Sequence, residues 1–262
     1  MEKVTVGSLT IAYEEQGEGE VLVLLHGFCG SSAYWENVAP LLADSFRVIM
    51  PDLRGHGASD APLGAYTIEQ MADDVALLLE ALGVEKYAVL GHSMGGYIAL
   101  SLAQRYNSRL SGFGLVHSTA YPDSDEAKEK RLKAVATINS EGITSFIDGL
   151  VPGLFAPKSL DKLSAAVDRV KELGYKTPPQ GAIGAAMAMR EREDRRDVLS
   201  SAPIPVLLVA GEKDGVIPPE RTFTTDKEHV AKAVIHGAGH MSMYEEPQRL
   251  ADIIKEFVSG LQ

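Results

Sequence analysis

A serine lies in the middle of a short glycine-rich segment, Gly91–Gly95, whose pattern is G-x-S-x-G. The apolar run Tyr87–Leu90 comes directly before it, and a segment with helical spacing, Met94–Tyr106, comes directly after it. A sharp turn from a strand into a helix accepts only small neighbours and exposes the serine hydroxyl at the start of the helix. The pattern therefore predicts that Ser93 is a nucleophile. The alternative is a tight turn that contains a serine by chance.

A serine nucleophile needs a base, because its hydroxyl reacts poorly near its free pKa. Of the seven histidines, His240 is the best placed. It lies in a glycine-containing loop between an expected last strand, Ala231–Ile235, and an expected C-terminal helix, Pro247–Phe257. His236 ends that strand and His92 is adjacent to the serine, so neither is preferred. His240 is the predicted general base, with a purely structural loop histidine as the alternative.

An acid must hold the second nitrogen of the imidazole and stabilise the charge that forms on the ring. Asp214 follows the apolar run Val206–Ala210, and the resulting order of serine, aspartate and histidine is one that serine hydrolases use. Glu212 is the neighbouring competitor. The run that ends at Val116 is followed by His117–Ala120, which contains no carboxylate, so an acid from that strand is not favoured.

Backbone amides can stabilise the oxyanion that forms when serine attacks a carbonyl group. Met94 offers one N–H directly after the predicted nucleophile, and the loop His26–Gly30 after the first buried strand offers another, which we assign to Phe28. A flexible glycine turn is the alternative for this loop. Cys29 lies in the same loop and is expected to be a thiol beside the pocket, not a nucleophile.

One uninterrupted apolar run, Val21–Leu25, is typical of a strand that is buried on both faces, and four further runs resemble it. These four are Phe46–Met50, Tyr87–Leu90, Leu110–Val116 and Val206–Ala210. Helical spacing is found at Tyr34–Ala43, Thr67–Leu82, Met94–Tyr106 and Pro247–Phe257, and Thr67 with Gln70 forms a capping-box pattern. A hairpin is predicted around Gly7 and Ser8. The alternation predicts an α/β fold, with a parallel sheet covered by helices on both faces.

The alternation stops between residues 121 and 200, where no convincing strand occurs. Charged, alanine-rich helical stretches alternate there with breakers such as Gly142, Pro157 and Gly174. Sheet-like sequence resumes at Ile204–Val206. We therefore expect one α/β core, residues 1–120 and 201–262, interrupted by an inserted helical cap, residues 121–200.

Composition limits the classes of function. The 262 residues are 45% hydrophobic, and their net charge of −11 argues against partners such as nucleic acid or an anionic membrane and leaves neutral or cationic ligands. Cys29 is the only cysteine, no apolar stretch reaches the about 18 residues of a membrane span, and no signal peptide follows Met1. A soluble, cytoplasmic protein is expected, and its oligomeric state is unknown from sequence. No zinc-ligand cluster or phosphate-binding glycine loop occurs, so neither a metal nor a cofactor is predicted.

Five segments together resemble the α/β-hydrolase superfamily: His26–Phe28, Asp52–Ser59, Gly91–Gly96, Gly211–Asp214 and Gly239–His240. The resemblance is closest to the capped branch with esterases, enol-lactonases, non-haem haloperoxidases and carbon–carbon-bond hydrolases, and it does not extend to the expected cap. It implies an eight-stranded, mostly parallel sheet with an antiparallel second strand and a pocket under the cap. Ser93 disfavours haloalkane dehalogenase and epoxide hydrolase activity, since those proteins carry aspartate at the elbow.

The leading functional hypothesis is a cofactor-independent serine hydrolase that cleaves a small carboxylic ester through an acyl-enzyme intermediate. A carbon–carbon-bond hydrolase, a lactonase or a thioesterase would use the same three side chains, because the fold and the triad do not determine the substrate. A small-molecule receptor on a hydrolase fold is an alternative from another class.

The cap contains a segment of small residues around Ile183 and Met187, whose helical spacing can place both side chains on one apolar face. If that face covers the pocket, Phe146, Leu154 and Phe155 are further lining candidates and a compact acyl group is favoured. Packing of the helix against the core is the alternative.

Overall fold

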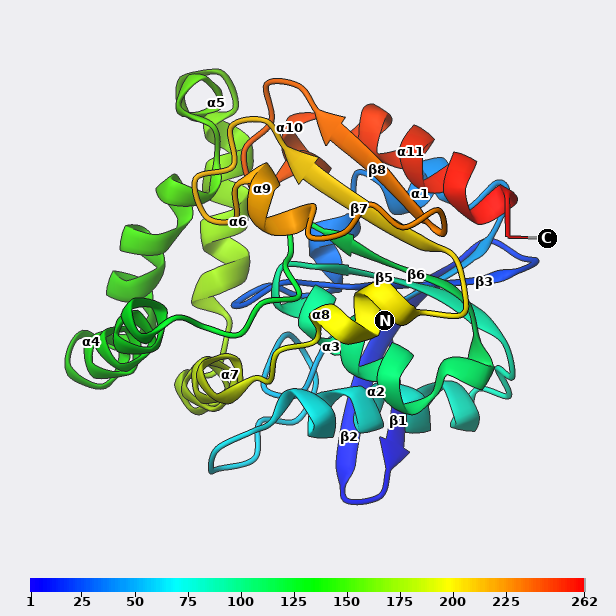
Figure 1. Ribbon diagram of the computed structural model, residues 1–262. Helices are drawn as coiled ribbons and strands as arrows, with labels where there is room; N and C mark the ends of the chain where they lie inside the picture. Colours follow the sequence, from blue (N-terminus) through cyan, green and yellow to red (C-terminus); the bar gives the residue numbers. More distant parts are fainter. Residues whose placement is uncertain (262) are drawn as a thin grey trace.

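The computed structural model describes residues 1–261, in which eight strands form one sheet in the order β1-β2-β4-β3-β5-β6-β7-β8 (Figure 1). The strands are β1 (Glu2–Val6), β2 (Leu9–Gln16), β3 (Val21–Leu25), β4 (Arg47–Pro51), β5 (Tyr87–His92), β6 (Leu110–Val116), β7 (Val206–Gly211) and β8 (Val230–Ile235). β2 pairs antiparallel with β1 and β4, and the other neighbours pair parallel. The predicted mostly parallel, eight-stranded fold is confirmed.

The central strands are buried on both faces, as their continuous apolar sequence predicts. In β3, Leu22 and Leu24 pack into one hydrophobic cluster, whereas Val23 and Leu25 pack into the other. Successive side chains of a strand point to opposite faces, so a strand between two layers of helices must be apolar at every position. The sheet is therefore the middle layer of three.

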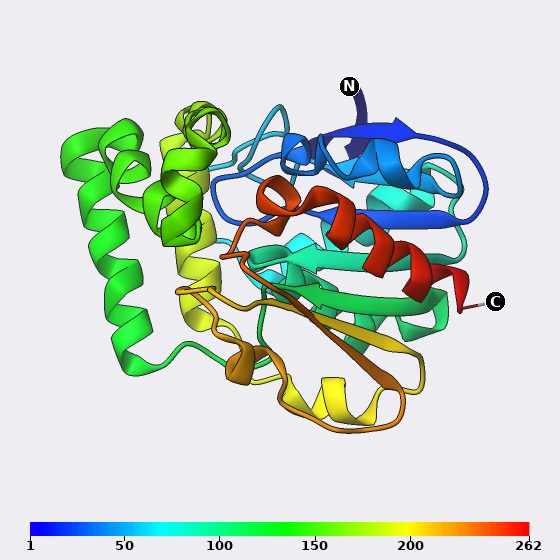
Figure 2. The ribbon, with the colours of Figure 1, turned by 90° about the horizontal axis from the view of Figure 1, so that it is seen from above.

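Helices cover both faces of the sheet (Figure 1, Figure 2). One layer contains α2 (Ile68–Ala81), α3 (Met94–Arg105) and α8 (Arg196–Ser201), and the other contains α1 (Ala39–Leu42) and α11 (Pro247–Ser259). Thr67 caps α2 as predicted, since its Oγ1 accepts a hydrogen bond of 3.0 Å from the Gln70 amide. The cap supplies an acceptor for an amide that has none within the helix.

The helix predicted at Tyr34–Ala43 is wrong. The segment instead contains a 3₁₀ helix, η1 (Ser32–Trp35), and the separate short helix α1. Pro40 lies in the first turn of α1, and a proline ring clashes with the carbonyl group four residues before it. A continuous helix cannot pass through this proline, so the chain starts a new one.

Between β6 and β7 the chain forms only helices. They are α4 (Asp125–Leu150), η3 (Val151–Leu154), α5 (Pro157–Lys162), α6 (Ser164–Tyr175), α7 (Pro179–Glu191) and α8. α4 is kinked at Gly142, whose φ of 87° and ψ of 169° are not helical. α4 to α7 lie beyond one end of the sheet (Figure 1, Figure 2), whereas α8 packs against α3. The division into core and cap at residues 120 and 200 stays a prediction.

Three short helical elements complete the fold: η2 (Asn107–Arg109), α9 (Pro219–Thr222) and α10 (Ser242–Glu245). α9 follows β7 and α10 follows β8, so both lie after strands that are neighbours in the sheet. Within residues 1–261, every helix is too short or too polar to cross a membrane.

Candidate active site

Ser93 occupies the sharp turn between β5 and α3. Its φ of 51° and ψ of −113° are rare for a residue with a side chain, so the backbone is strained there. Two hydrogen bonds hold the turn: the Ser93 amide donates to the Val116 carbonyl group at 2.9 Å, and Ser118 Oγ donates to the Ser93 carbonyl group at 2.7 Å. The strand, turn and helix predicted around this serine are all present.

Two glycines allow the turn to close. A side chain on Gly91 would collide with the backbone of Gly95. A Cβ atom on Gly95 would lie 2.6 Å from the Leu25 carbonyl oxygen at the end of β3. Such contacts are too short for real atoms, so only glycine fits at both positions. The spacing of glycines in the motif thus has a steric cause.

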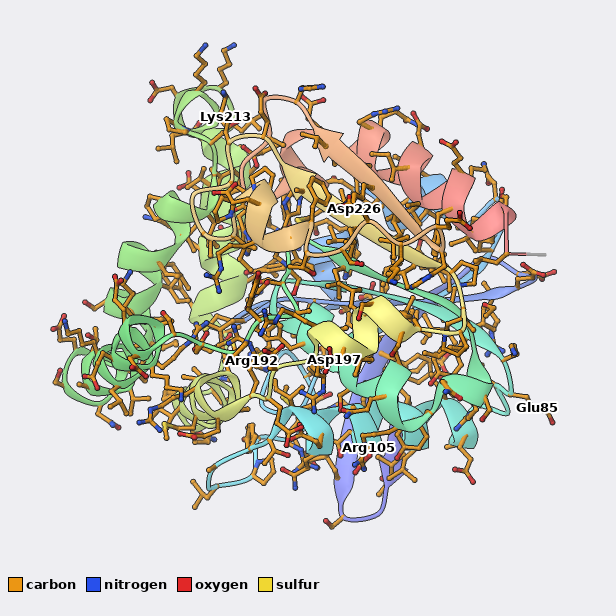
Figure 3. The ribbon with its side chains drawn as sticks, in the orientation of Figure 1. Glu85, Arg105, Arg192, Asp197, Lys213 and Asp226 are labelled. Carbon is orange, nitrogen blue, oxygen red and sulfur yellow. The ribbon has the colours of Figure 1, made fainter. Side chains whose placement is uncertain are left out.

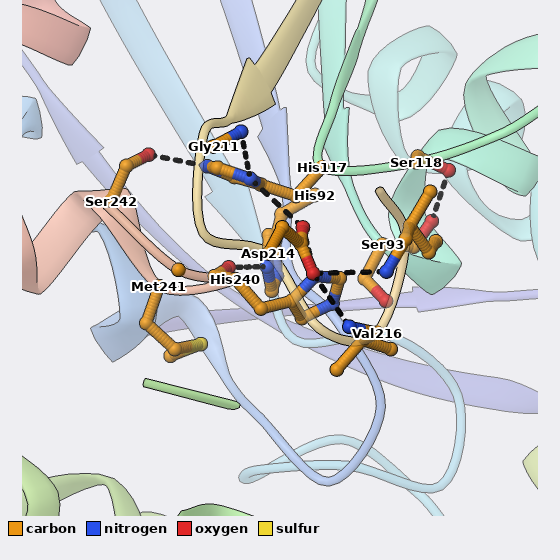
Figure 4. A network of polar contacts seen from close by, with 12 residues as sticks. His92, Ser93, His117, Ser118, Gly211, Asp214, Val216, His240, Met241 and Ser242 are labelled. Carbon is orange, nitrogen blue, oxygen red and sulfur yellow. Dashed lines mark hydrogen bonds and ion pairs between the residues drawn. The ribbon is translucent and has the colours of Figure 1, made fainter. Parts of the chain in front are cut away.

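Asp214 and His240 meet at the same end of the sheet. Asp214 follows β7 and His240 follows β8, and Asp214 Oδ2 lies 2.8 Å from His240 Nδ1 (Figure 4). The other carboxylate oxygen accepts the amides of Val216 at 2.8 Å and Ile217 at 2.9 Å. Burial opposes ionisation of Asp214, but His240 and His117 outweigh it and hold the pKa of this carboxyl well below its usual range. The pair has the geometry of a base and the acid that orients it.

The competitor Glu212 does not contact His240. Its carboxylate accepts the Gly237 amide at 2.9 Å and lies 3.3 Å from the Lys213 ammonium group. Its side chain is 41% exposed, whereas that of Asp214 is fully buried. The structure therefore brings Asp214, and not Glu212, to the histidine.

The histidine loop is held by a carboxylate that sequence analysis did not identify. Glu245 in α10 accepts the amide of Gly239 at 2.8 Å and that of Ala156 at 2.9 Å. The His240 amide also donates to the Leu154 carbonyl group at 2.8 Å. These bonds join the loop after β8 to the inserted helical segment, and the bond between Ala156 and Glu245 joins residues 89 positions apart, which no local pattern indicates.

Three other histidines near the site have internal partners. His92 Nε2 lies 2.9 Å from the His240 carbonyl oxygen, and His26 Nε2 accepts the Leu53 amide at 2.9 Å. Burial lowers the pKa of His92 well below its usual value, lowers that of His26 to about 4 and lowers that of His56 to about 3. These rings are neutral near pH 7 and serve as hydrogen-bonding parts of the scaffold.

A further histidine, His117, contacts the acid directly. Its Nδ1 lies 3.2 Å from Asp214 Oδ2, and its Nε2 lies 2.6 Å from Ser242 Oγ (Figure 4). His117 is fully buried and has a φ of 50°. Its segment, His117–Ala120, contains no carboxylate and so gave no candidate acid from sequence, although the end of β6 lies beside the end of β7, where a partner for Asp214 could be expected.

The predicted oxyanion donors lie next to Ser93. Met94 is the first residue of α3, and the loop containing Phe28 lies against Ser93, since a Cβ atom on Gly27 would be 3.3 Å from the Ser93 Cβ atom. Neither the Phe28 nor the Met94 amide donates to another backbone group within residues 1–261. Both donors therefore remain available to a ligand. Cys29 is buried and does not itself line the cavity, whereas its neighbour Phe28 does.

Ser93 and His240 line one cavity of about 450 Å³. Of the five predicted pocket residues, only Leu154 lines it. The other four, Phe146, Phe155, Ile183 and Met187, do not line this cavity. Phe146 instead packs against Phe28 at a ring-centroid distance of 5.9 Å, and Ile183 packs against the hydrophobic cluster that contains α11. Met189, two residues after Met187 in α7, takes the lining position.

The presence of Met189 and not Met187 in the lining has a simple geometric cause. Positions 187 and 189 differ by about 200° around a helix, so one methionine faces the cavity only if the other faces away. Because small apolar residues surround both methionines, the sequence of α7 carries no clear polar face that would distinguish the two orientations.

If the cavity takes the acyl group of an ester, as the hydrolase hypothesis expects, Met189→Ala should shift the preference toward longer acyl groups, because the substitution enlarges the cavity. Each methylene that fits contributes roughly 1–3 kcal/mol of discrimination, so the shift should be about 10-fold in relative kcat/KM. The measurement is kcat/KM for 4-nitrophenyl esters from acetate to octanoate. Met187→Ala is the matched control and should keep the wild-type profile; the same shift in both variants would contradict the assignment.

One group of potential metal ligands comes together in residues 1–261. His117, Asp214 and His240 each place one ligand atom within 4.8 Å of the others. Both imidazole contacts of Asp214 Oδ2 have the length of hydrogen bonds, and the second carboxylate oxygen accepts two backbone amides. The donor set fits a hydrogen-bonded network better than a metal site.

Chelation provides a direct test of this interpretation. If the three side chains act through hydrogen bonds, prolonged dialysis against EDTA should leave kcat and KM within about 2-fold of their starting values. Loss of activity that returns when Zn²⁺ is added would show that the cluster holds a metal.

Comparison with known proteins identifies the fold family of this chain. The family model described as alpha/beta hydrolase fold matches residues 20–147. An esterase from Thermogutta terrifontis, solved with malate bound, is 33% identical in sequence, with a TM-score of 0.95 and coverage of 100% of this chain and 99% of that one. The chain belongs to the α/β-hydrolase fold family.

Two curated relatives of this α/β hydrolase are named as hydrolytic enzymes. The 2-(acetamidomethylene)succinate hydrolase of Mesorhizobium japonicum is 27% identical, over 98% of this chain and 95% of the relative. The 3-oxoadipate enol-lactonase 1 of Acinetobacter baylyi is 29% identical, over 87% of this chain and 84% of the relative. Relatives of this α/β hydrolase therefore include esterases, enol-lactonases and other hydrolases that act on small substrates.

Proposed function

We propose that this protein is a serine hydrolase that cleaves small carboxylic esters through an acyl-enzyme intermediate. The observation that carries the proposal is the hydrogen-bonded pair of Asp214 and His240, which shares one cavity with the strained elbow of Ser93. Ser93 is the nucleophile, His240 the general base and Asp214 the acid that orients it.

In the first half of the reaction, Ser93 Oγ bonds to the carbonyl carbon of the ester while His240 takes the hydroxyl proton. The bond to the alcohol oxygen then breaks, and His240 returns that proton to the leaving group. In the second half, water attacks the acyl carbon and gives one proton to His240. The bond to Ser93 Oγ breaks, and the proton returns to this oxygen as the carboxylic acid leaves.

The negative charge that forms on the carbonyl oxygen in both halves needs donors that are already in place. The amides of Phe28 and Met94 take this role, each lowering the barrier by about 3 kcal/mol. Asp214 stays ionised because its pKa lies well below the usual range, so it can stabilise the imidazolium form of His240. No metal or cofactor takes part in this scheme.

We further propose that α4 to α7 form a cap over the cavity. Support comes from the cavity lining, which includes Lys130 and Leu150 of α4, Leu154 of η3 and Met189 of α7 beside the catalytic side chains. Lactone hydrolysis is the second candidate, because a cyclic ester presents the same carbonyl group and an enol-lactonase is among the relatives.

Labelling with a fluorophosphonate tests the nucleophile and the enzyme class together. We expect a single covalent adduct, which peptide mapping assigns to Ser93. A substrate panel of esters, lactones, thioesters and β-diketones then identifies the preferred bond. Absence of an adduct together with absence of turnover across the panel would favour the small-molecule receptor.

The activity should rise with pH through a single ionisation, because His240 must be neutral to accept a proton. Asp214 adds no second step in the accessible range, since its pKa lies well below the usual value and the carboxylate stays charged. The measurement is kcat/KM between about pH 4.5 and 9 with a substrate whose chemistry is rate-limiting. A flat profile would count against His240 as the base.

A further inference from the structure

The cavity beside Ser93 is positively charged, although the chain carries a net charge of −11. Six charged side chains line it: Asp123, Glu126, Lys130, Arg131, Arg192 and Arg221. Four of them are cationic and two are anionic, so the lining has an excess of two positive charges. The local charge is thus opposite in sign to that of the whole protein.

One carboxylate serves two of the arginines. The buried Asp123 binds Arg192 through one oxygen and Arg131 Nε through the other, the latter at 3.0 Å. Arg192 also donates to the Tyr121 and Met189 carbonyl groups, and its guanidinium carbon lies 4.0 Å from the centroid of the Tyr97 ring. Arg192 lies at the connection from α7 to α8 (Figure 3), and its guanidinium group is therefore already engaged in contacts within the protein.

Two cations in the cavity keep free donors. Arg131 uses only Nε, and its two terminal nitrogens have no hydrogen-bond partner within residues 1–261. Arg221 in α9 is exposed, stacks over the Tyr121 ring at 4.8 Å, and has no carboxylate within ion-pairing distance among the described residues. The remaining pair, Lys130 and Glu126, is exposed on α4. Lys130 Nζ lies 2.8 Å from Glu126 Oε1, so the two charges neutralise each other.

We propose that the substrate is a small ester that carries a free carboxylate, which Arg131 and Arg221 bind while Ser93 attacks the ester group. A half ester of a short dicarboxylic acid has this chemistry. Guanidinium groups with free terminal nitrogens pair with carboxylates through two parallel hydrogen bonds. The inference rests on the proposed ester hydrolysis and replaces the earlier expectation of a neutral or cationic ligand.

Two esters that differ only at the far end test this proposal: monomethyl glutarate, which ends in a carboxylate, and methyl pentanoate, which ends in a methyl group. Each is added as a competitor of 4-nitrophenyl acetate, so binding is measured whether or not the competitor is cleaved. We expect the anionic ester to bind at least about 10-fold more tightly, as a charge-assisted hydrogen bond would provide. Arg221→Gln should lower this ratio by about 10-fold, and Arg131→Gln should lower it as well.

The matched control is Arg249→Gln, which removes an exposed arginine of α11 that does not line the cavity and should leave both the ratio and the turnover unchanged. If 4-nitrophenyl acetate is not hydrolysed and no fluorophosphonate adduct forms, the proposed function itself fails. If this ester is hydrolysed but the two competitors bind equally, or the ratio survives both arginine substitutions, the function stands and the anionic substrate is refuted.

A second inference concerns His117, which touches the same oxygen of Asp214 as His240 does. The Gly211 amide also points at His117 Nδ1 at 3.2 Å, so this ring nitrogen either accepts from Gly211 or carries a proton and donates to Asp214. We assign the proton of the neutral ring to Nδ1, because a bare nitrogen beside a buried carboxylate would be repelled, and Ser242 then donates to Nε2. Burial lowers the pKa of His117, which favours this neutral form.

The geometry points to His117 as a positioning residue that holds Asp214 Oδ2 toward His240. The charged or titratable groups around His117 are Asp214, His240, His92 and, at longer range, Glu245. When the donor is removed, Asp214 interacts more strongly with the imidazolium form of His240, so the base should titrate at higher pH. Asparagine can place an amide N–H where Nδ1 lies, and it tolerates the positive φ of 50°.

We expect His117→Ala to lower kcat about 10-fold with little change in KM, and to move the rise of kcat/KM to higher pH. His117→Asn should restore both values toward wild type. Ser242→Ala, which leaves the strained backbone untouched, should change the profile in the same direction as His117→Ala. If His117→Ala and Ser242→Ala keep the wild-type pH profile, or if His117→Asn is no better than alanine, the positioning role is refuted.

Discussion

Ser93→Ala should reduce kcat for ester hydrolysis by about 10⁶-fold, the loss typical of a serine hydrolase that lacks its nucleophile. The substitution removes one oxygen atom and keeps the Cβ atom. The strained turn and its hydrogen bonds to Val116 and Ser118 therefore stay as they are. Steady-state kinetics measure the loss, and the fluorophosphonate adduct should disappear with it.

The fold of this variant should be unaffected, because the Ser93 side chain contributes chemistry and little core volume. A melting temperature within about 2 °C of wild type and an unchanged circular dichroism spectrum are the controls. Undiminished turnover by correctly folded Ser93→Ala protein would refute the serine mechanism altogether.

Asp214→Asn should cost about 10⁴-fold in kcat, because the amide has the shape of the carboxylate but neither its charge nor its acceptor pattern. The amide group of asparagine can donate to His240 Nδ1, which places the ring proton on the nitrogen that must accept one from Ser93. The loss of charge also removes the stabilisation of the imidazolium form. The loss of kcat is measured at a pH above the rise in kcat/KM, so that it is not confused with a shift of that rise along the pH axis.

The matched control is Glu212→Gln, in the same loop and with the same change from acid to amide. Glu212 contacts Gly237 and Lys213 and not His240, so kcat should stay within about 2-fold of wild type. A larger loss in Glu212→Gln than in Asp214→Asn would transfer the role of the acid to Glu212.

Local sequence was enough to predict the frame of the site. β3 and β6 have the predicted bounds, and the strand, turn and helix around Ser93 agree with prediction to within two residues. The physical reason is that a strand buried on both faces must be apolar at every position, and a sharp elbow must have glycines around it. Both requirements act on neighbouring residues, so they are visible in a short stretch of sequence.

The order of the chain also predicted the meeting of Asp214 with His240. Parallel strands end at one edge of the sheet, so side chains that follow β7 and β8 must lie close to each other. Only the structure excludes the competitor Glu212, two residues before Asp214, as the partner of His240. Which of the two carboxylates turns inward depends on the conformation of the loop, and the sequence of the loop is compatible with either one turning inward.

The lining of the cavity was decided by tertiary structure alone. Met189 and not Met187 faces it, and the arginines of α4 and α9 reach it, because helices from an inserted segment pack against loops that are distant in sequence. The same holds for His117, whose contact with Asp214 joins residues 97 positions apart. The sequence by itself therefore determined the α/β sheet, the elbow and the candidate catalytic residues. The packing of the inserted helices decided which side chains face the substrate, since no periodicity within one helix specifies the neighbour against which it will pack.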